Sequence, residues 1–170
     1  MQVMALVSGI PATGKSEYGR WLQRERGFIH LDLENGGMNG PRLRPAWQEC
    51  VGSGSPSGLV QAMQELGGAV LLDWGFPPQF LRLVRSLNDA GVAAWWFDGD
   101  REAARANFIR RATVPVEALD AQMKEISKAW PEIEAFYGHR IINVISASGS
   151  CLPPEQISAL MFDPGRVGRQ

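Results

Sequence analysis

The sequence of 170 residues contains only two cysteines, and its positive and negative charges nearly balance. Cys50 and Cys151 lie far apart and lack the close spacing of metal-binding pairs, so we expect free thiols in a reducing compartment. Seventeen lysine and arginine residues balance 18 aspartate and glutamate residues, for a net charge of -1. Because domains that bind duplex DNA usually carry a strong basic surplus, any contact with nucleic acid must be local.

Long apolar runs are also missing. The apolar segment from Met1 to Val7 has no basic flank, and Ser8 and Gly9 interrupt it. It is too short for a signal peptide or a membrane span. We therefore expect a cytoplasmic protein with no membrane partner.

What is present is an alternation of short apolar runs with amphipathic segments. Strands are expected at 3–7, 28–32, 69–72, 92–97 and 141–145. This alternation predicts a three-layer α/β sandwich with a five-stranded, mostly parallel sheet. We expect one domain over residues 1–163 and a flexible tail at 164–170.

Two regions depart from this alternation. Residues 35–58 are rich in glycine, proline, serine and asparagine, which predicts a mobile loop with one short helix near 46–51. Two successive helices at about 100–130 have no strand between them. We expect these two helices to form a lid.

One motif carries chemistry, and it lies directly after the first strand. It matches the P-loop (Walker A) pattern G-x-x-x-x-G-K-[ST] completely, with the residues Gly9, Ile10, Pro11, Ala12, Thr13, Gly14, Lys15 and Ser16. A buried strand before the motif and an amphipathic helix after it are the expected context. Backbone N–H groups of such a loop and the helix N-terminus bind phosphate oxygens, Lys15 neutralises the β and γ phosphates, and Ser16 is a ligand of Mg²⁺.

Carboxylates follow two of the expected strands. Asp73 closes the third strand and fits a role in holding Mg²⁺. Asp32 and Glu34 lie at or just past the end of the second strand, and either one fits the role of a base that takes a proton from an attacking hydroxyl. The alternative is that these carboxylates are solvated groups at strand ends.

Absent motifs narrow the class of nucleotide-binding protein. GTPases recognise guanine with an N/T-K-x-D sequence, which does not occur here. Motor-like and ring-forming ATPases usually need a further helical domain, for which this chain is too short. A small phosphotransferase remains.

The segment from Arg105 to Leu119, a basic helix, a Val-Pro corner and an amphipathic helix, resembles the lid of small P-loop kinases. This group includes the phage polynucleotide kinase domain and the zeta-toxin-like and gluconate-kinase-like proteins. The resemblance implies an ATP- and Mg²⁺-dependent kinase in which Arg110, or alternatively Arg105 or Arg111, closes over the phosphates.

The acceptor and the base stay open at this point. In the family the base is an aspartate just beyond the second strand, where this chain offers Glu34 or Asp32. Trp74 and Phe76, with Trp47, either line an acceptor pocket or pack in the core. The acceptor is a hydroxyl of a small molecule or the 5′-hydroxyl of a polynucleotide.

Two further functions are compatible with the same motif. One is a regulator or adaptor that binds ATP without transferring phosphate, and the other is a simple ATPase that has no phosphoryl acceptor.

Overall fold

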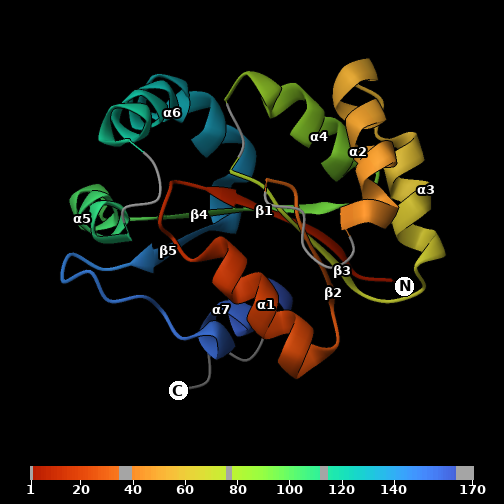
Figure 1. Ribbon diagram of the computed structural model, residues 1–170, viewed down its shortest axis with the longest axis horizontal. Helices are drawn as coiled ribbons and strands as arrows, with labels where there is room; N and C mark the ends of the chain where they lie inside the picture. Colours follow the sequence, from red (N-terminus) through yellow and green to blue (C-terminus); the bar gives the residue numbers. More distant parts are fainter. Residues whose placement is uncertain (1, 35–39, 76–77, 112–114, 164–170) are drawn as a thin grey trace. The chain divides into compact units, whose positions relative to one another are not determined.

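The computed structural model describes residues 2–34, 40–75, 78–111 and 115–163, without the side chains of residues 40–42 and 111 (Figure 1). The tail at 164–170 and Phe76 lie outside the described residues. Five strands form a sheet in the order β2-β3-β1-β4-β5. Their bounds are β1 Met4–Gly9, β2 Ile29–Asp32, β3 Val70–Asp73, β4 Ala93–Gly99 and β5 Ile141–Ile145.

Helices separate the strands along the chain, as the apolar periodicity predicts. They are α1 Lys15–Arg26, α2 Gly40–Ser53, α3 Ser57–Glu65, α4 Leu81–Asp89, α5 Arg101–Arg111, α6 Val116–Tyr137 and α7 Pro154–Phe162, with the short 3-10 turns η1 Pro78–Phe80 and η2 Gly138–Arg140. The strand pairs β1–β3, β2–β3 and β4–β5 are parallel. The expected α/β class with a five-stranded sheet is therefore confirmed.

The chain divides into two compact units: residues 1–8 with 15–94, and residues 9–14 with 95–170. In the first unit, α1 lies on one face of the strands β1, β2 and β3, while α2, α3 and α4 lie on the other face (Figure 1). β1 and β3 are buried along their whole lengths. Burial on both faces explains why these strands read as continuous apolar runs.

In the second unit, β4 and β5 lie between α6 and α7, and α5 follows β4 directly (Figure 1). Trp96 and Phe97 of β4 are fully buried, and so is Ile126 of α6. The register of the β4–β5 pair shifts between Asp98 and Gly99, at the carboxyl end of β4. The chain leaves the sheet at this point and enters α5.

The expectation of an irregular segment with only a short helix near 46–51 is wrong for residues 40–58, because α2 extends from Gly40 to Ser53 and α3 begins at Ser57. Residues 35–39 of that segment lie outside the described residues. Leu43, Trp47 and Cys50 are buried at a spacing of four and three residues, which is one face of a helix. The glycine and prolines at the start of α2 are typical of loops, so the composition of this segment did not predict a helix there.

The second helix of the expected lid is also longer than predicted, because α6 continues past Pro131 to Tyr137. Ile126, Ile133 and Tyr137 are buried and continue one apolar stripe along it. Burial of this stripe outweighs the hydrogen bond that the proline removes from the helix. Within the described ranges, no helix is long and apolar enough to cross a lipid bilayer.

Candidate functional site

The loop that follows β1 has a backbone typical of anion-binding loops. Ala12 has φ 61° and Gly14 has φ 76°, so left-handed residues recur at alternate positions. Alternation of this kind turns successive N–H groups toward one side. Ala12 is the one non-glycine residue with a positive φ in the described part of the chain. Such a conformation is costly for alanine and is typical of functional loops.

Close packing against β4 fixes the start of this loop. The Ile10 N–H donates a hydrogen bond to the Phe97 carbonyl over 3.0 Å. A side chain at Gly9 would overlap the backbone of Phe97, so only glycine fits there. The Thr13 hydroxyl donates to the Ile10 carbonyl over 2.8 Å, and both residues are buried. The loop is thus held in place from within its own unit.

Lys15 is the first residue of α1, and three carboxylates act on it electrostatically. Loss of hydration lowers the pKa of the Lys15 ammonium, whereas Asp73, Glu34 and Asp32 raise it, in decreasing order of effect. The net shift is downward. The structure therefore brings together four residues that the sequence analysis assigned to the site.

Asp32 and Asp73 reach this position through the register of two strands. They are direct partners in the parallel β2–β3 pair, and each is the last residue of its strand. Both are buried, with exposed fractions of 7% and 3%. The Glu34 N–H donates to Asp32 Oδ1 over 3.0 Å, which turns the chain after β2 so that Glu34 lies beside the two aspartates.

Glu34 differs from the two aspartates because its side chain is open to solvent. Partial loss of hydration raises the pKa of the Glu34 carboxyl, and the Asp73 and Asp32 carboxylates raise it further. The Lys15 ammonium and a hydrogen bond from the Gly75 N–H lower it, but the net shift is upward. A side chain at Gly75 would come within 2.6 Å of Glu34 Oε1, so glycine leaves room for the carboxylate.

His30 is a member of this cluster that the sequence analysis left without a role. Its Nε2 lies 3.5 Å from Asp73 Oδ2, and both side chains are buried. His30 precedes Asp32 by two residues on β2, so the two side chains share one face of the strand. The two-residue spacing from Asp32 is the feature of the sequence that could have predicted the place of His30 in this cluster.

Arginines of the expected lid have partners within the second unit. Arg105 of α5 binds Asp120 of α6 through two hydrogen bonds, from Nε over 2.8 Å and from Nη2 over 3.0 Å. Arg110 is exposed and donates to the Asn107 side-chain oxygen. The Asn107 amide in turn donates to the Gly149 carbonyl over 3.3 Å. The side chain of Arg111 lies outside the described residues.

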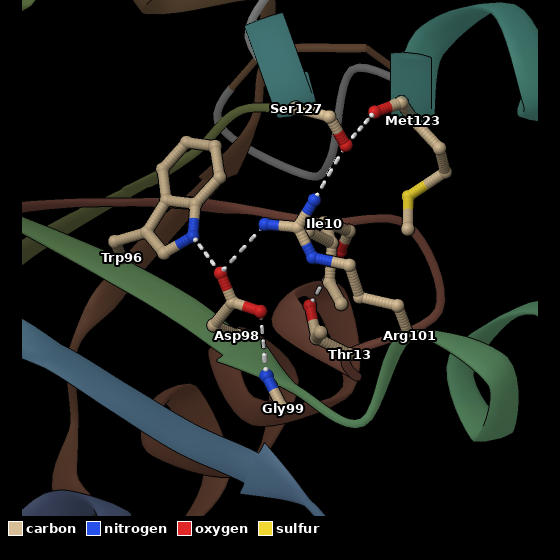
Figure 2. A network of polar contacts seen from close by, with 8 residues as sticks. All are labelled: Ile10, Thr13, Trp96, Asp98, Gly99, Arg101, Met123 and Ser127. Atoms are coloured by element: carbon tan, nitrogen blue, oxygen red, sulfur yellow. Dashed lines mark hydrogen bonds and ion pairs between the residues drawn. The ribbon is translucent and has the colours of Figure 1, made fainter. Parts of the chain in front are cut away.

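A second polar network, which the sequence analysis did not single out, surrounds Asp98 at the end of β4 (Figure 2). The Trp96 indole N–H and the Gly99 N–H each donate to this buried carboxylate over 2.8 Å. The Arg101 guanidinium lies 3.7 Å from it and donates to the Ser127 hydroxyl over 2.8 Å. Arg101 thus connects the end of β4 with α6.

The aromatic residues near the carboxylate cluster pack together. Trp47 and Trp74 are buried and meet edge to face, with ring centroids 4.6 Å apart. Phe80 packs on Trp74, with their ring centroids 5.4 Å apart. These contacts favour core packing over an open aromatic pocket, and they anchor α2 to the end of β3.

The donor set suits a magnesium ion held chiefly by phosphate and water. Asp73 Oδ2 is buried and has no hydrogen-bond partner among the described residues. Ser16, one residue after Lys15, is partly exposed. Mg²⁺ in phosphotransferase sites is usually bound through one or two carboxylates together with substrate phosphates. The residues present therefore fit the ion that a P-loop implies.

Comparison with protein-family models finds no match, and comparison with curated protein sequences finds none either. Solved structures do match. A gluconokinase from Sinorhizobium meliloti 1021 has a TM-score of 0.53 and 14% identity, with 93% of this chain and 88% of that chain covered. The tunicamycin resistance protein of Deinococcus radiodurans has a TM-score of 0.53 and 17% identity, with coverage of 94% and 96%.

A shikimate kinase from Bacteroides thetaiotaomicron aligns over 99% of both chains, with a TM-score of 0.52 and 14% identity. The chain has the fold of small P-loop kinases. This finding confirms the resemblance to that group at the level of the fold. Ligands of open α/β sheets bind outside the carboxyl ends of the strands. Asp32 and Asp73 lie at the carboxyl ends of β2 and β3.

Proposed function

We propose that this protein is an ATP- and Mg²⁺-dependent kinase that moves the γ-phosphate of ATP to a hydroxyl acceptor. The observation that supports it best is the position of Lys15, which follows an anion-binding loop and interacts electrostatically with Asp73, Glu34 and Asp32. A lysine among three carboxylates supplies opposite charges next to one another. Phosphoryl transfer needs this combination, because phosphate and metal are bound together.

The donor is held by main-chain groups and by Lys15. Backbone N–H groups of residues 10–16 bind the phosphate oxygens, and the N-terminus of α1 adds partial positive charge. Lys15 neutralises the β and γ phosphates. Because the loop is already held by Phe97 and Thr13, little rearrangement is needed when ATP binds.

The metal is held by the Ser16 hydroxyl and by Asp73, directly or through its water shell. Mg²⁺, when bound, supplies positive charge next to the β and γ phosphate oxygens. The carboxylate of Asp73 orients this charge from the end of β3. Its Oδ2 has no hydrogen-bond partner within the described ranges, so the carboxylate keeps acceptor capacity for this role.

Glu34 is the better candidate for the residue that takes the proton of the acceptor hydroxyl. It is open to solvent, and its pKa is raised toward neutral pH, where a general base works best. Asp32 is buried, and its Oδ1 already accepts the Glu34 N–H. We therefore assign proton transfer to Glu34 and its placement to Asp32.

Helices α5 and α6 act as the lid in this proposal, and Arg110 closes over the transferring phosphate. Arg110 is the exposed arginine whose described contact is with the polar side chain of Asn107, whereas Arg105 forms a two-point ion pair with Asp120. Closure excludes water, which otherwise attacks ATP in place of the acceptor.

The test is a comparison of Lys15→Ala with the matched variant Lys124→Ala, which removes an exposed lysine of α6. Both proteins are incubated with γ-labelled ATP, Mg²⁺ and a pool of sugars, sugar acids, nucleosides and oligonucleotides. We expect labelled product with wild type and Lys124→Ala, and none with Lys15→Ala. Wild-type transfer by Lys15→Ala would reject the proposal.

The same assay separates the other two functions. ATP binding without any labelled product indicates a regulator or adaptor, and release of phosphate without an acceptor indicates an ATPase. If an acceptor is labelled, the salt dependence of its binding identifies its class. Several phosphate contacts to a polynucleotide give a steep dependence, and a neutral metabolite gives almost none.

A further inference from the structure

His30 is a buried titratable side chain that the proposed mechanism does not use. It lies in the middle of β2 and is 4% exposed. Its Nε2 is 3.5 Å from Asp73 Oδ2, and neither atom has a hydrogen-bond partner among the described residues. Because an unpartnered buried polar atom is costly, two such atoms that lie this close together need an explanation.

The ring of His30 has little freedom to turn away. A methyl group at Gly19 of α1 would overlap the imidazole, so the ring lies directly against the helix backbone at that point. Gly19 itself is buried. The helix that follows the P-loop therefore fixes His30 against Asp73.

Asp73 also interacts with a cation. Among the carboxylates that act on Lys15, Asp73 has the largest effect. The carboxylate of Asp73 thus interacts electrostatically with the Lys15 ammonium and has the His30 imidazole beside it. Two fixed neighbours define the orientation of a carboxylate, whereas one neighbour leaves it free to rotate.

We infer that His30 is a positioning residue, whose Nε2–H holds Asp73 Oδ2 so that the carboxylate faces the magnesium of bound Mg·ATP. This inference rests on the proposed function, because it concerns the metal in the same site. Partners that orient a metal-binding residue typically change metal affinity 10- to 100-fold when they are removed. The loss is expected in the binding of metal and not in the binding of nucleotide alone.

The experiment compares His30→Leu, which removes the polar ring, with His30→Gln, which keeps an N–H donor at nearly the same distance from the backbone. His139→Leu, at an exposed histidine in η2, is the matched control. Calorimetry measures ATP binding in EDTA and with increasing Mg²⁺, and the paramagnetic signal of Mn²⁺ reports metal binding without turnover.

We expect His30→Leu to bind ATP in EDTA within about threefold of wild type, and to need at least tenfold more Mg²⁺ or Mn²⁺ for tight binding. His30→Gln restores most of this loss, and His139→Leu does not change it. Wild-type metal dependence in His30→Leu would overturn the inference. Equal loss in His30→Gln and His30→Leu would also overturn it, since a space-filling role does not depend on a donor.

A second measurement separates this inference from the proposed function. If the wild type binds no Mg·ATP, the proposed function fails. The contact with Asp73 is then judged by a double-mutant cycle of His30→Leu and Asp73→Asn in urea unfolding. Coupling that changes the unfolding equilibrium by at least fivefold supports the contact, and coupling below twofold rejects it.

Discussion

Asp32 and Asp73 lie opposite each other at the ends of two neighbouring parallel strands, and both carboxylates are buried. Two such groups repel each other when ionised, and the Lys15 ammonium opposes this repulsion. The site thus holds more negative than positive charge around one lysine. Removal of a single charge from the site is therefore expected to change ligand binding and stability.

Lys15→Met is expected to abolish ATP binding without destabilising the fold at pH 7. The pKa of Lys15 is lowered in the folded state, mainly by loss of hydration, so the charged form is disfavoured there relative to the unfolded chain. The folded state binds fewer protons than the unfolded state between the lowered pKa and 10.5, and wild-type stability rises with pH in that window.

Urea unfolding at pH 7 and calorimetry with Mg·ATP check this prediction, with Lys124→Met as the control. A large fall in the free energy of unfolding of Lys15→Met would show that the ammonium stabilises the carboxylates more than its own dehydration costs. Retained ATP binding would contradict the role of Lys15 itself.

Glu34→Gln is expected to raise the free energy of unfolding at pH 7. The pKa of Glu34 is raised above 4.5 in the folded state, so the folded state binds more protons and stability falls as pH rises from 4.5 through the raised pKa. Below pH 4.5 the carboxyl is protonated in both states, and the advantage of glutamine disappears.

Urea unfolding at pH 7 and pH 4 measures this difference, with Glu132→Gln at an exposed position of α6 as the control. If Glu34 takes the acceptor proton, Glu34→Gln also lowers transfer at least tenfold. A variant that keeps full transfer would assign the proton to another group, of which Asp32 is the next candidate.

Gly19→Ala is expected to destabilise the protein by about 1–3 kcal/mol, because the added methyl overlaps the His30 ring in a packed interior. Gly52→Ala is the matched control, since Gly52 also lies in a helix and has no atom near the position of a Cβ. The control should gain about 0.5–1 kcal/mol, as alanine is the better helix former.

The two variants are compared by urea unfolding. Combining Gly19→Ala with His30→Ala should recover much of the loss, because the smaller side chain removes the overlap. Equal stability of Gly19→Ala and Gly52→Ala would mean that the His30 ring moves away without cost.

Arg105 and Arg110 should differ sharply in their effects on transfer. Arg105 is exposed and held by Asp120, and this hydrogen-bonded pair raises the pKa of Arg105 and lowers the pKa of Asp120. We expect Arg105→Ala and Asp120→Asn to change the urea midpoint little, since exposed ion pairs contribute little to stability. Transfer should stay within about threefold of wild type in both.

Arg110→Ala, in contrast, should lower transfer by at least tenfold while leaving ATP binding nearly unchanged, because a guanidinium that closes late acts on the transition state. Initial rates of transfer at saturating ATP measure both effects. The opposite order, with Arg105 essential and Arg110 dispensable, would assign the phosphate contact to Arg105 and require its ion pair to open.

Local patterns were sufficient for much of this fold. The strand before the P-loop, the helix after it and the strand at 141–145 were predicted within a few residues, because an apolar run between glycine-rich turns has few alternative structures. Of α2, only a short helix near 46–51 was predicted; its first turns were missed, because Gly40, Pro41 and Pro45 lie in them. The end of α6 was missed because packing of Ile133 and Tyr137 outweighs the break that Pro131 predicts.

The sequence by itself determined the P-loop, because eight consecutive residues with fixed types and spacing make a local structure that depends on backbone freedom and charge. It also determined the carboxylate-bearing strand ends. Only the tertiary structure decided that Asp32 is the partner of Asp73, that His30 lies against both Asp73 and Gly19, and that Arg105 is paired with Asp120. These relationships depend on strand register and on helix packing, in which residues far apart in the chain meet, and no local spacing encodes such contacts.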